Sequence, residues 1–210
     1  LAGGALPARA EQLDVAATVR GVVRVVIIAT NGQDAYFVGH GSGFAVAPDK
    51  VLTNAHVAGK GRDLRVILDD DQEFEAILIA QDPQIDLALL KVPVQPQASQ
   101  AWPAAVFSTA EPRPGELVFA YGHPWGQRSV LTGGILSAIV SARTPAGQIP
   151  LLRTDLQLAP GNSGGPLLNA AGEVIGLNAM IFGGDQSVAI PSSLICSFLA
   201  QARQKQEEFL

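Results

Sequence analysis

The stretch Gly161-Asn162-Ser163-Gly164-Gly165-Pro166 places a serine hydroxyl among glycines, with apolar residues behind it. A serine hydroxyl becomes a useful nucleophile only when a nearby base accepts its proton. It also needs main-chain N–H groups aimed at the oxyanion that forms on attack. Glycines meet this need because they adopt unusual φ and ψ angles and let a substrate carbonyl approach the main chain. We interpret Ser163 as the candidate nucleophile of a hydrolase, although the same composition also favours a plain turn between two strands.

The base that would activate this serine must be one of three histidines, and all of them precede it in the chain: His40, His56 and His123. The α/β-hydrolase fold has its histidine after the serine and a helix directly behind the nucleophile, and neither condition holds here. The order acid, histidine, serine belongs to an α/β fold with long helices, which this sequence does not predict. The order histidine, aspartate, serine remains, and it is one of the known orders of a catalytic triad.

His56 is the preferred base, because it follows the strand-like run Val51-Leu52-Thr53 and a tight bend. Such a bend would hold the imidazole toward the serine, while the other ring nitrogen donates to an acid that fixes the tautomer. Asp86 is the preferred acid, since it stands directly before the apolar run Leu87–Leu90 at the mouth of a predicted strand. Asp155, which lies between apolar residues, remains the alternative acid.

The composition argues against several other classes. The 210 residues carry a formal net charge of −5 without a basic stripe, which disfavours a nucleic-acid surface. One cysteine and three scattered histidines give no zinc-binding spacing, and no phosphate-binding or dinucleotide-binding loop is found. We therefore expect no metal and no cofactor. Cys196 lies in an apolar stretch and is predicted to be packed inside, and Asp69-Asp70-Asp71 is predicted to be a solvated turn.

Many short β-branched runs separated by Gly or Pro predict strands, and this spacing is typical of barrels. Ala8–Arg20 and Ser192–Glu208 have helical patterns, Pro93–Pro103 is predicted to be a linker, and the glycine-rich Gly39–Gly43 separates two predicted strands. We predict an all-β fold of two small antiparallel barrels with one helix at each end. The predicted divisions are 1–20 for the N-terminal helical segment, 21–105 for the first barrel and linker, 106–191 for the second barrel, and 192–210 for the C-terminal helix.

These motifs resemble the trypsin-like serine proteases, and specifically the HtrA/DegP group. The matching pieces follow the order of that group: Gly41-Ser42-Gly43-Phe44, Leu52–Val57, Asp86–Val92, Thr154-Asp155, Pro160–Leu167, Gly172–Asn178 and Ala189–Ser192. The resemblance implies two six-stranded barrels with a catalytic triad on His56, Asp86 and Ser163. It also implies an oxyanion hole formed by the main-chain N–H groups of Gly161 and Ser163, with Asn162 between them.

By the same resemblance, Gln157–Pro160 and Asn178–Phe182 would wall the primary specificity pocket. The implied substrate-binding residues are Leu158, Asn178, Ala179 and Met180, and they suggest a small or medium apolar side chain in the substrate. The main chain near these last three residues would pair with an extended peptide as an added strand.

The sequence departs from the HtrA/DegP pattern in several places, one of which is the short loop Thr30–Ala35, where some members have a long insertion. His123 stands where the group usually has Asn, so the adjoining loop is expected to differ, and a structural role is the simplest interpretation of this residue. The stretch after Pro191 is too short for the PDZ domain of the group, and residues 1–12 lack the aromatic residues of its trimer-forming segment. Both monomer and trimer therefore stay open, and any PDZ domain or membrane tether is expected outside this chain.

The resemblance implies a serine endopeptidase that cuts unfolded or extended polypeptides, in quality control or processing outside the cytoplasm. The expected location is the bacterial periplasm, or a membrane anchor facing it. The expected partner is a polypeptide substrate, with no nucleic acid. A second hypothesis, from another class, is a protease-like peptide-binding or chaperone module held in a resting state with a collapsed oxyanion hole.

Overall fold

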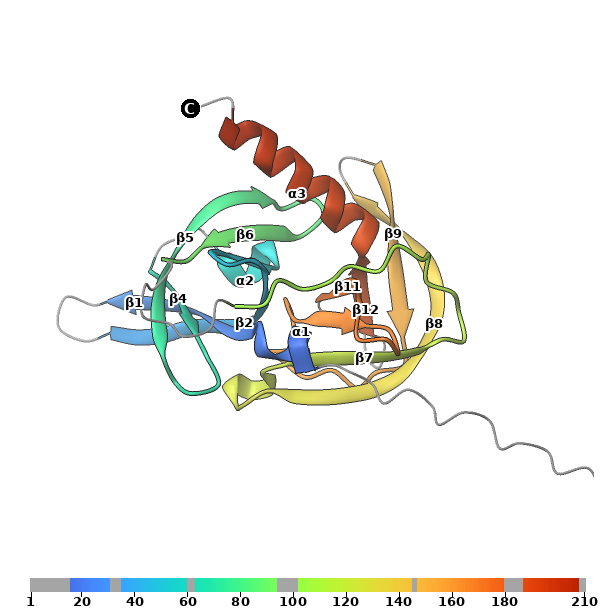
Figure 1. The fold of residues 1–210 in the computed structure, drawn as a ribbon, viewed down its shortest axis with the longest axis horizontal. Coiled ribbons are helices and arrows are strands. Elements are labelled where there is room, and N and C mark those ends of the chain that lie inside the picture. The colour runs from blue at the N-terminus through green and yellow to red at the C-terminus, as the bar shows by residue number, and fades with distance from the viewer. Residues whose placement is uncertain are drawn as a thin grey trace, which may run out of the picture.

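The structure is a computed structural model, and it describes residues 16–30, 35–59, 63–93, 102–144, 147–179 and 187–207. The strands form two closed antiparallel barrels that lie side by side, the first in blue and green and the second in yellow and orange (Figure 1). The prediction of an all-β fold with two six-stranded barrels is confirmed.

The first barrel contains β1 (Val22–Thr30), β2 (Ala35–Ala47), β3 (Lys50–Thr53), β4 (Leu64–Ile67), β5 (Glu73–Asp82) and β6 (Leu87–Lys91), in the order β1-β2-β3-β6-β5-β4. The second contains β7 (Leu117–Gly122), β8 (Val130–Thr144), β9 (Gly147–Thr154), β10 (Pro166–Leu168), β11 (Val174–Ala179) and β12 (Ser187–Pro191), in the order β10-β11-β12-β9-β8-β7. The described helices are α1 (Ala16–Arg20), α2 (Ala55–Ala58), the 3-10 turn η1 (Pro124–Gly126) and α3 (Ser192–Glu207).

The glycine-rich segment does not interrupt the sheet, because β2 runs without a break through Gly39–Gly43. These glycines permit close packing inside a strand. A Cβ on Gly43 would lie 2.7 Å from a methyl carbon of Val51, and a Cβ on Gly41 would lie 2.6 Å from a methyl carbon of Val57. Most of the predicted linker, and the first part of the predicted N-terminal helix, lie outside the described residues.

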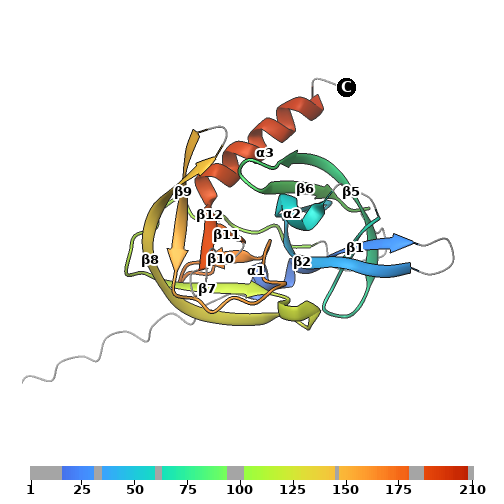
Figure 2. The same cartoon turned by 180° about the vertical axis from the view of Figure 1, so that it is seen from behind.

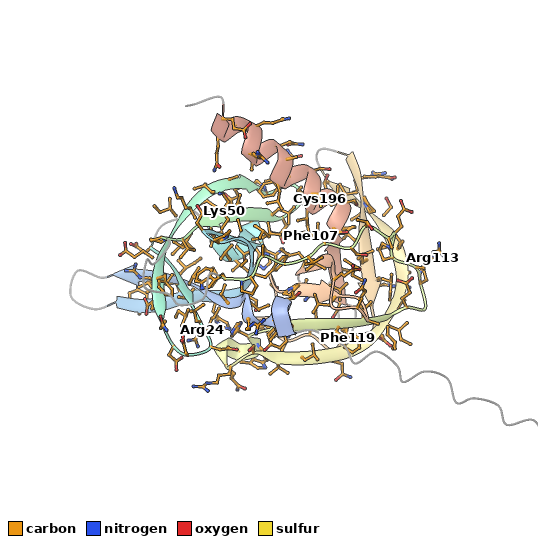
Figure 3. All side chains as sticks on the ribbon, viewed as in Figure 1. Arg24, Lys50, Phe107, Arg113, Phe119 and Cys196 are labelled. Carbon is orange, nitrogen blue, oxygen red and sulfur yellow. The ribbon has the colours of Figure 1, made fainter. Side chains whose placement is uncertain are left out.

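Each barrel has its own apolar interior, and a further core cluster joins the two barrels. The joining cluster includes Phe44 and Leu52 of the first barrel and Leu177 and Ile190 of the second. Phe107 packs against Phe44 with ring centroids 6.3 Å apart, and Figure 3 shows it between the barrels. This shared core fixes the barrels against each other, so residues from both can be held in one site.

Helix α3 crosses the ends of both barrels, as the two opposite views of Figures 1 and 2 show. Its buried face carries Ile195, Phe198 and Ala202 at helical spacing. Burial of each of the two larger side chains contributes about 1.5–3 kcal/mol of transfer free energy. Cys196 follows a buried position by one residue and is exposed, so the prediction that it is packed inside was wrong. Among the described helices, none is long and apolar enough to span a membrane.

Candidate active site

His56 and Asp86 are joined by two hydrogen bonds. His56 Nδ1 lies 2.8 Å from Asp86 Oδ2, and the main-chain N–H of His56 donates to Asp86 Oδ1 at 2.9 Å. His56 belongs to the single-turn helix α2, directly after β3, and Asp86 directly precedes β6. Because β3 and β6 are hydrogen-bonded neighbours, the barrel brings the two residues together.

Hydrogen bonds also hold the main chain of the turn that carries Asp86. Asp86 has a positive φ of 57°, a conformation that Asp tolerates better than most side chains. Its carbonyl oxygen accepts from the N–H of Ala55 at 3.1 Å and from Nδ2 of Asn54 at 3.0 Å. With Nδ1–H directed at the carboxylate, His56 presents Nε2 as the free basic nitrogen.

Ser163 lies on the tight turn that precedes β10, and this turn is bonded to β2 of the first barrel. The N–H of Ser42 donates to the carbonyl oxygen of Ser163 at 2.7 Å, and Thr53 Oγ1 donates to the carbonyl oxygen of Ser42 at 2.7 Å. Ser42 thereby connects the serine turn to the end of β3, three residues before His56. The structure thus places Ser163 beside the element that carries the histidine.

Glycine is required in this turn for steric reasons. Gly164 has a φ of 88°, and a Cβ there would lie 2.0 Å from the carbonyl oxygen of Ser42 and 2.5 Å from Thr53 Oγ1. Gly161 has a φ of 105°, and a Cβ there would lie 2.3 Å from the carbonyl oxygen of His123. Both positions combine a backbone conformation that disfavours side chains with a close main-chain neighbour.

The peptide groups around Gly161 are held by three hydrogen bonds. Trp125 N–H donates to the Pro160 carbonyl at 2.7 Å, Ser42 Oγ donates to the Gly161 carbonyl at 2.6 Å, and Asn162 N–H donates to the Ala159 carbonyl at 3.0 Å. Within the described residues, the N–H groups of Gly161 and Ser163 have no acceptor. Two free amides in one turn are suited to bind an oxyanion.

Within the described residues, neither of the other candidates, Asp155 and His40, makes a hydrogen bond to His56 or Asp86. Asp155, the alternative acid, accepts from the N–H of Ile135 at 2.6 Å through Oδ1. His40 lies on β2 and is exposed. Within the described ranges, no three His, Cys, Asp or Glu side chains come together in a way that could hold a metal ion.

The residues assigned to substrate binding are placed as follows. Asn178 is buried, and its main-chain groups bond Gly164 N–H and the Gly165 carbonyl, each at 2.8 Å. Leu158 and Ala179 are half-buried and pack against core clusters. Met180 lies outside the described residues.

Sequence reasoning missed a polar network between the barrels. Asp69 of the β4–β5 turn lies 3.2 Å from His123 Nε2 through Oδ1, and its Oδ2 accepts from Ser129 Oγ at 2.5 Å. Ser129 Oγ also lies 2.8 Å from the Tyr121 hydroxyl. The Asp69 side chain is 48% exposed, as predicted for a solvated turn, but the sequence did not predict that this turn also bonds to the second barrel.

The network changes the protonation of its members. Burial lowers the pKa of His123, an effect that Asp69 opposes. Burial raises the pKa of Asp69, but hydrogen bonds from Ser129 and the attraction of His123 outweigh it, so this pKa is lowered overall. Burial raises the pKa of Tyr121. A neutral imidazole beside a charged carboxylate is therefore the expected state of the pair at neutral pH.

One six-stranded barrel carries a hydrogen-bonded His–Asp pair, and the other carries a serine on a glycine-rich turn. This combination defines the trypsin-like class of serine peptidase domains. A family profile for the trypsin-like peptidase domain matches residues 41–177. Mitochondrial serine protease HTRA2 of Bos taurus is 38% identical over 181 residues, which are 82% of this chain and 38% of the relative. A probable periplasmic DegP-like serine endoprotease of Pseudomonas fulva is 41% identical over 160 residues, 73% of this chain and 33% of the relative.

Solved structures give the same assignment. The inactive form of the Rv3671c protease has a TM-score of 0.76 and 27% identity, covering 93% of this chain and 95% of that one. An HtrA-type protease solved with a tripeptide has a TM-score of 0.75 and 29% identity, covering 89% of this chain and 61% of that one. This chain therefore belongs to the trypsin-like peptidase family, in its HtrA/DegP group. It spans about a third of the length of the curated relatives described above.

Proposed function

We propose that this chain hydrolyses peptide bonds with His56, Asp86 and Ser163 as its catalytic triad. The observation that carries the proposal is the two-point bond between His56 and Asp86, which leaves Nε2 free to act as the base. His56 Nε2 takes the proton of Ser163 while Ser163 Oγ bonds to the substrate carbonyl carbon. His56 then gives this proton to the leaving amine as the peptide bond breaks. Water, activated by His56 in the same way, then attacks the acyl-enzyme and releases the carboxylic acid product from Ser163.

The free amides of Gly161 and Ser163 form the proposed oxyanion hole, with Asn162 between them. Removing one such donor in a serine protease costs roughly 10²–10³-fold in turnover. Leu158, Ala179 and Met180 would contact the substrate side chain, which favours a small or medium apolar residue. Asn178 supports the site through the bonds of its main chain to the serine turn.

The proposed substrate is an unfolded or extended polypeptide, because the site would bind the main chain of the substrate as an added strand. The proposed setting is protein quality control or processing outside the cytoplasm, which the periplasmic names of several relatives support.

The proposal is tested by comparing cleavage of one substrate protein in two forms, one kept unfolded by chemical modification and one folded and unmodified. We expect the unfolded form to be cut and Ser163→Ala to leave both forms intact. Mass spectrometry of the products then reports the residue before each cut, which is expected to be small or medium and apolar. Cleavage that persists in Ser163→Ala would contradict the proposed nucleophile.

A second candidate is a resting, peptide-binding state. No hydrogen bond joins Ser163 Oγ to His56 in the part of the chain that the structure describes. Such bonds are often loose before substrate arrives and tighten in the reacting complex. Saturable binding of an extended peptide without cleavage would favour this candidate over the enzyme.

A further inference from the structure

His123 is the most enclosed titratable side chain near the serine turn. It is 2% exposed and lies between β7 and η1 of the second barrel. Its Nε2 faces Asp69 of the first barrel at 3.2 Å, and its Nδ1 is buried without a partner among the described residues. The imidazole therefore bonds through one nitrogen only, and that bond crosses from one barrel to the other.

The main chain of the same turn is linked to both peptide groups that flank Gly161, directly to one and through the Ser42 hydroxyl to the other. The N–H of His123 donates to Ser42 Oγ at 2.9 Å, and Ser42 Oγ donates in turn to the Gly161 carbonyl. The N–H of Trp125 donates to the Pro160 carbonyl. The carbonyl of His123 occupies the space where a side chain on Gly161 would be.

These bonds fix the direction of an oxyanion-hole amide. In a trans peptide the C=O and the N–H point in opposite directions. Because Trp125 holds the Pro160 carbonyl, it also sets the direction of the Gly161 N–H. A glycine peptide rotates easily, so without the turn nothing among these contacts would hold that N–H in place.

The turn itself has a strained backbone and needs support. Trp125 and Gly126 both have positive φ angles, of 57° and 70°, and for Trp this conformation is costly. Asp69 holds His123 and Ser129, while Arg24 of β1 donates to the Gly126 carbonyl at 2.6 Å. Figure 3 shows Arg24 on the side of the first barrel that faces this turn. Among the described residues, side chains of the first barrel thus bond both this turn and the residues that follow it.

We propose that His123, held by Asp69, is a positioning residue for the oxyanion hole: it fixes the turn that orients the peptide groups on both sides of Gly161. The inference rests on the proposed function, because it assumes that the Gly161 N–H binds the oxyanion. His123 does not touch the substrate and acts only through main-chain groups.

The proton on His123 matters for this role. The charged and titratable groups around it in the described structure are Asp69 and Asp71 of the β4–β5 turn, Arg24 of β1, Tyr121 of β7 and Arg128 after η1. A second proton would sit on the buried Nδ1, which has no acceptor among the described residues, and Arg24 adds repulsion. Acid is therefore expected to loosen the turn.

The test compares the rate at which a fluorophosphonate modifies Ser163 in the wild type, His123→Ala and His123→Gln. The phosphonyl oxygen occupies the oxyanion hole, so the rate reports its geometry. We expect His123→Ala to lose tenfold or more in this rate, approaching the roughly 10²-fold loss of a whole donor. His123→Gln should restore most of it, since the Gln amide can donate from the position of Nε2. Peptide affinity, measured in a Ser163→Ala background, should stay within twofold.

Asp69→Asn gives the same test without touching the buried residue, and Asp70→Asn is its matched control. Asp70 lies in the same turn and bonds only Gln72 within the described residues. We expect Asp69→Asn to slow the reaction and Asp70→Asn to leave it unchanged. The ratio of the wild-type rate to the His123→Gln rate should fall below pH 6.5, because the two proteins differ only at His123 and every other pH effect is common to both.

The outcomes separate the two proposals. No adduct on Ser163 in the wild type would contradict the proposed function and remove the basis of this inference. A wild-type adduct with equal rates in His123→Ala and Asp69→Asn would overturn the inference alone. Parallel losses of peptide affinity and reaction rate, not restored by His123→Gln, would show a merely structural residue and would also overturn it.

Discussion

Asp86 holds His56 at two points, the imidazole through Oδ2 and the main-chain N–H through Oδ1, at 2.8 and 2.9 Å. The carboxylate thus positions both the ring and the backbone of the histidine. The β3–β6 pairing of the first barrel places the two residues at neighbouring strand ends. The tautomer and the orientation of the proposed base are therefore set before any substrate binds.

Asp86→Asn should lower turnover by roughly 10⁴-fold, because an amide favours the wrong tautomer of the histidine. Steady-state kinetics on a peptide substrate measure this loss, with KM expected to change little. Asp82→Asn is a suitable control, since Asp82 bonds the N–H of Gln84 in an exposed turn nearby. Near-normal turnover of Asp86→Asn would contradict the role of Asp86 and leave Asp155 as the candidate acid.

Gly164→Ala should destabilise the fold by about 3 kcal/mol, from left-handed strain together with overlap of the new Cβ with Ser42 and Thr53. Gly115→Ala is the matched control, because Gly115 also has a positive φ but open space at the Cβ position. Urea unfolding gives the free energy of unfolding of both variants. The loss in Gly115→Ala reports the backbone strain alone, and the additional loss in Gly164→Ala reports the overlap. Equal losses in the two would show that the close approach has no cost.

Ser42→Ala should cost about 1–3 kcal/mol, because it leaves the buried N–H of His123 and the carbonyl of Gly161 without their partner. The same change is expected to lower kcat more than KM, since the Gly161 peptide loses a restraint. Ser141→Ala, which removes an exposed hydroxyl bonded to Gln148 at 3.4 Å, is the control. A fully stable and fully active Ser42→Ala would refute the linking role of this residue.

Stability should fall with acid in a way that depends on His123. Burial lowers the pKa of His123 in the folded state from the ordinary 6.5. Below pH 6.5 the unfolded chain therefore binds a proton that the folded chain resists, and the stability conferred by the neutral ring is lost as pH falls through the folded pKa. Denaturant unfolding at pH 7.5, 6.5 and 5.5 should show a steeper decline for the wild type than for His123→Gln. Parallel declines would mean that the ring titrates normally.

Local sequence predicted the barrels because strands and turns depend on short patterns, and the same patterns singled out the residues of the proposed site. The order of His56, Asp86 and Ser163 excluded competing folds, and the alternating short strands closed into barrels as expected. Position in the sequence could not show that Asp69 meets His123, because their contact depends on how the two barrels dock. The Gly41-Ser42-Gly43 motif was a signal for Ser42, but its hydrogen bonds only became visible with the fold.

The error at Cys196 has a related physical cause. The residue lies in an apolar stretch, yet helix α3 buries only one face. A helix turns about 100° per residue, so the neighbour of a buried residue can face solvent. Apolar composition alone therefore did not decide which side of the helix this thiol would occupy.

The most direct test of the account is intact-mass spectrometry after treatment with a fluorophosphonate, with Ser163→Ala as the control. A single adduct in the wild type, mapped to Ser163 and absent from the control, is the predicted result. It would show that His56, Asp86 and the free amides activate this serine in the chain as it stands. No adduct, or an adduct that survives in Ser163→Ala, would contradict the proposed active site.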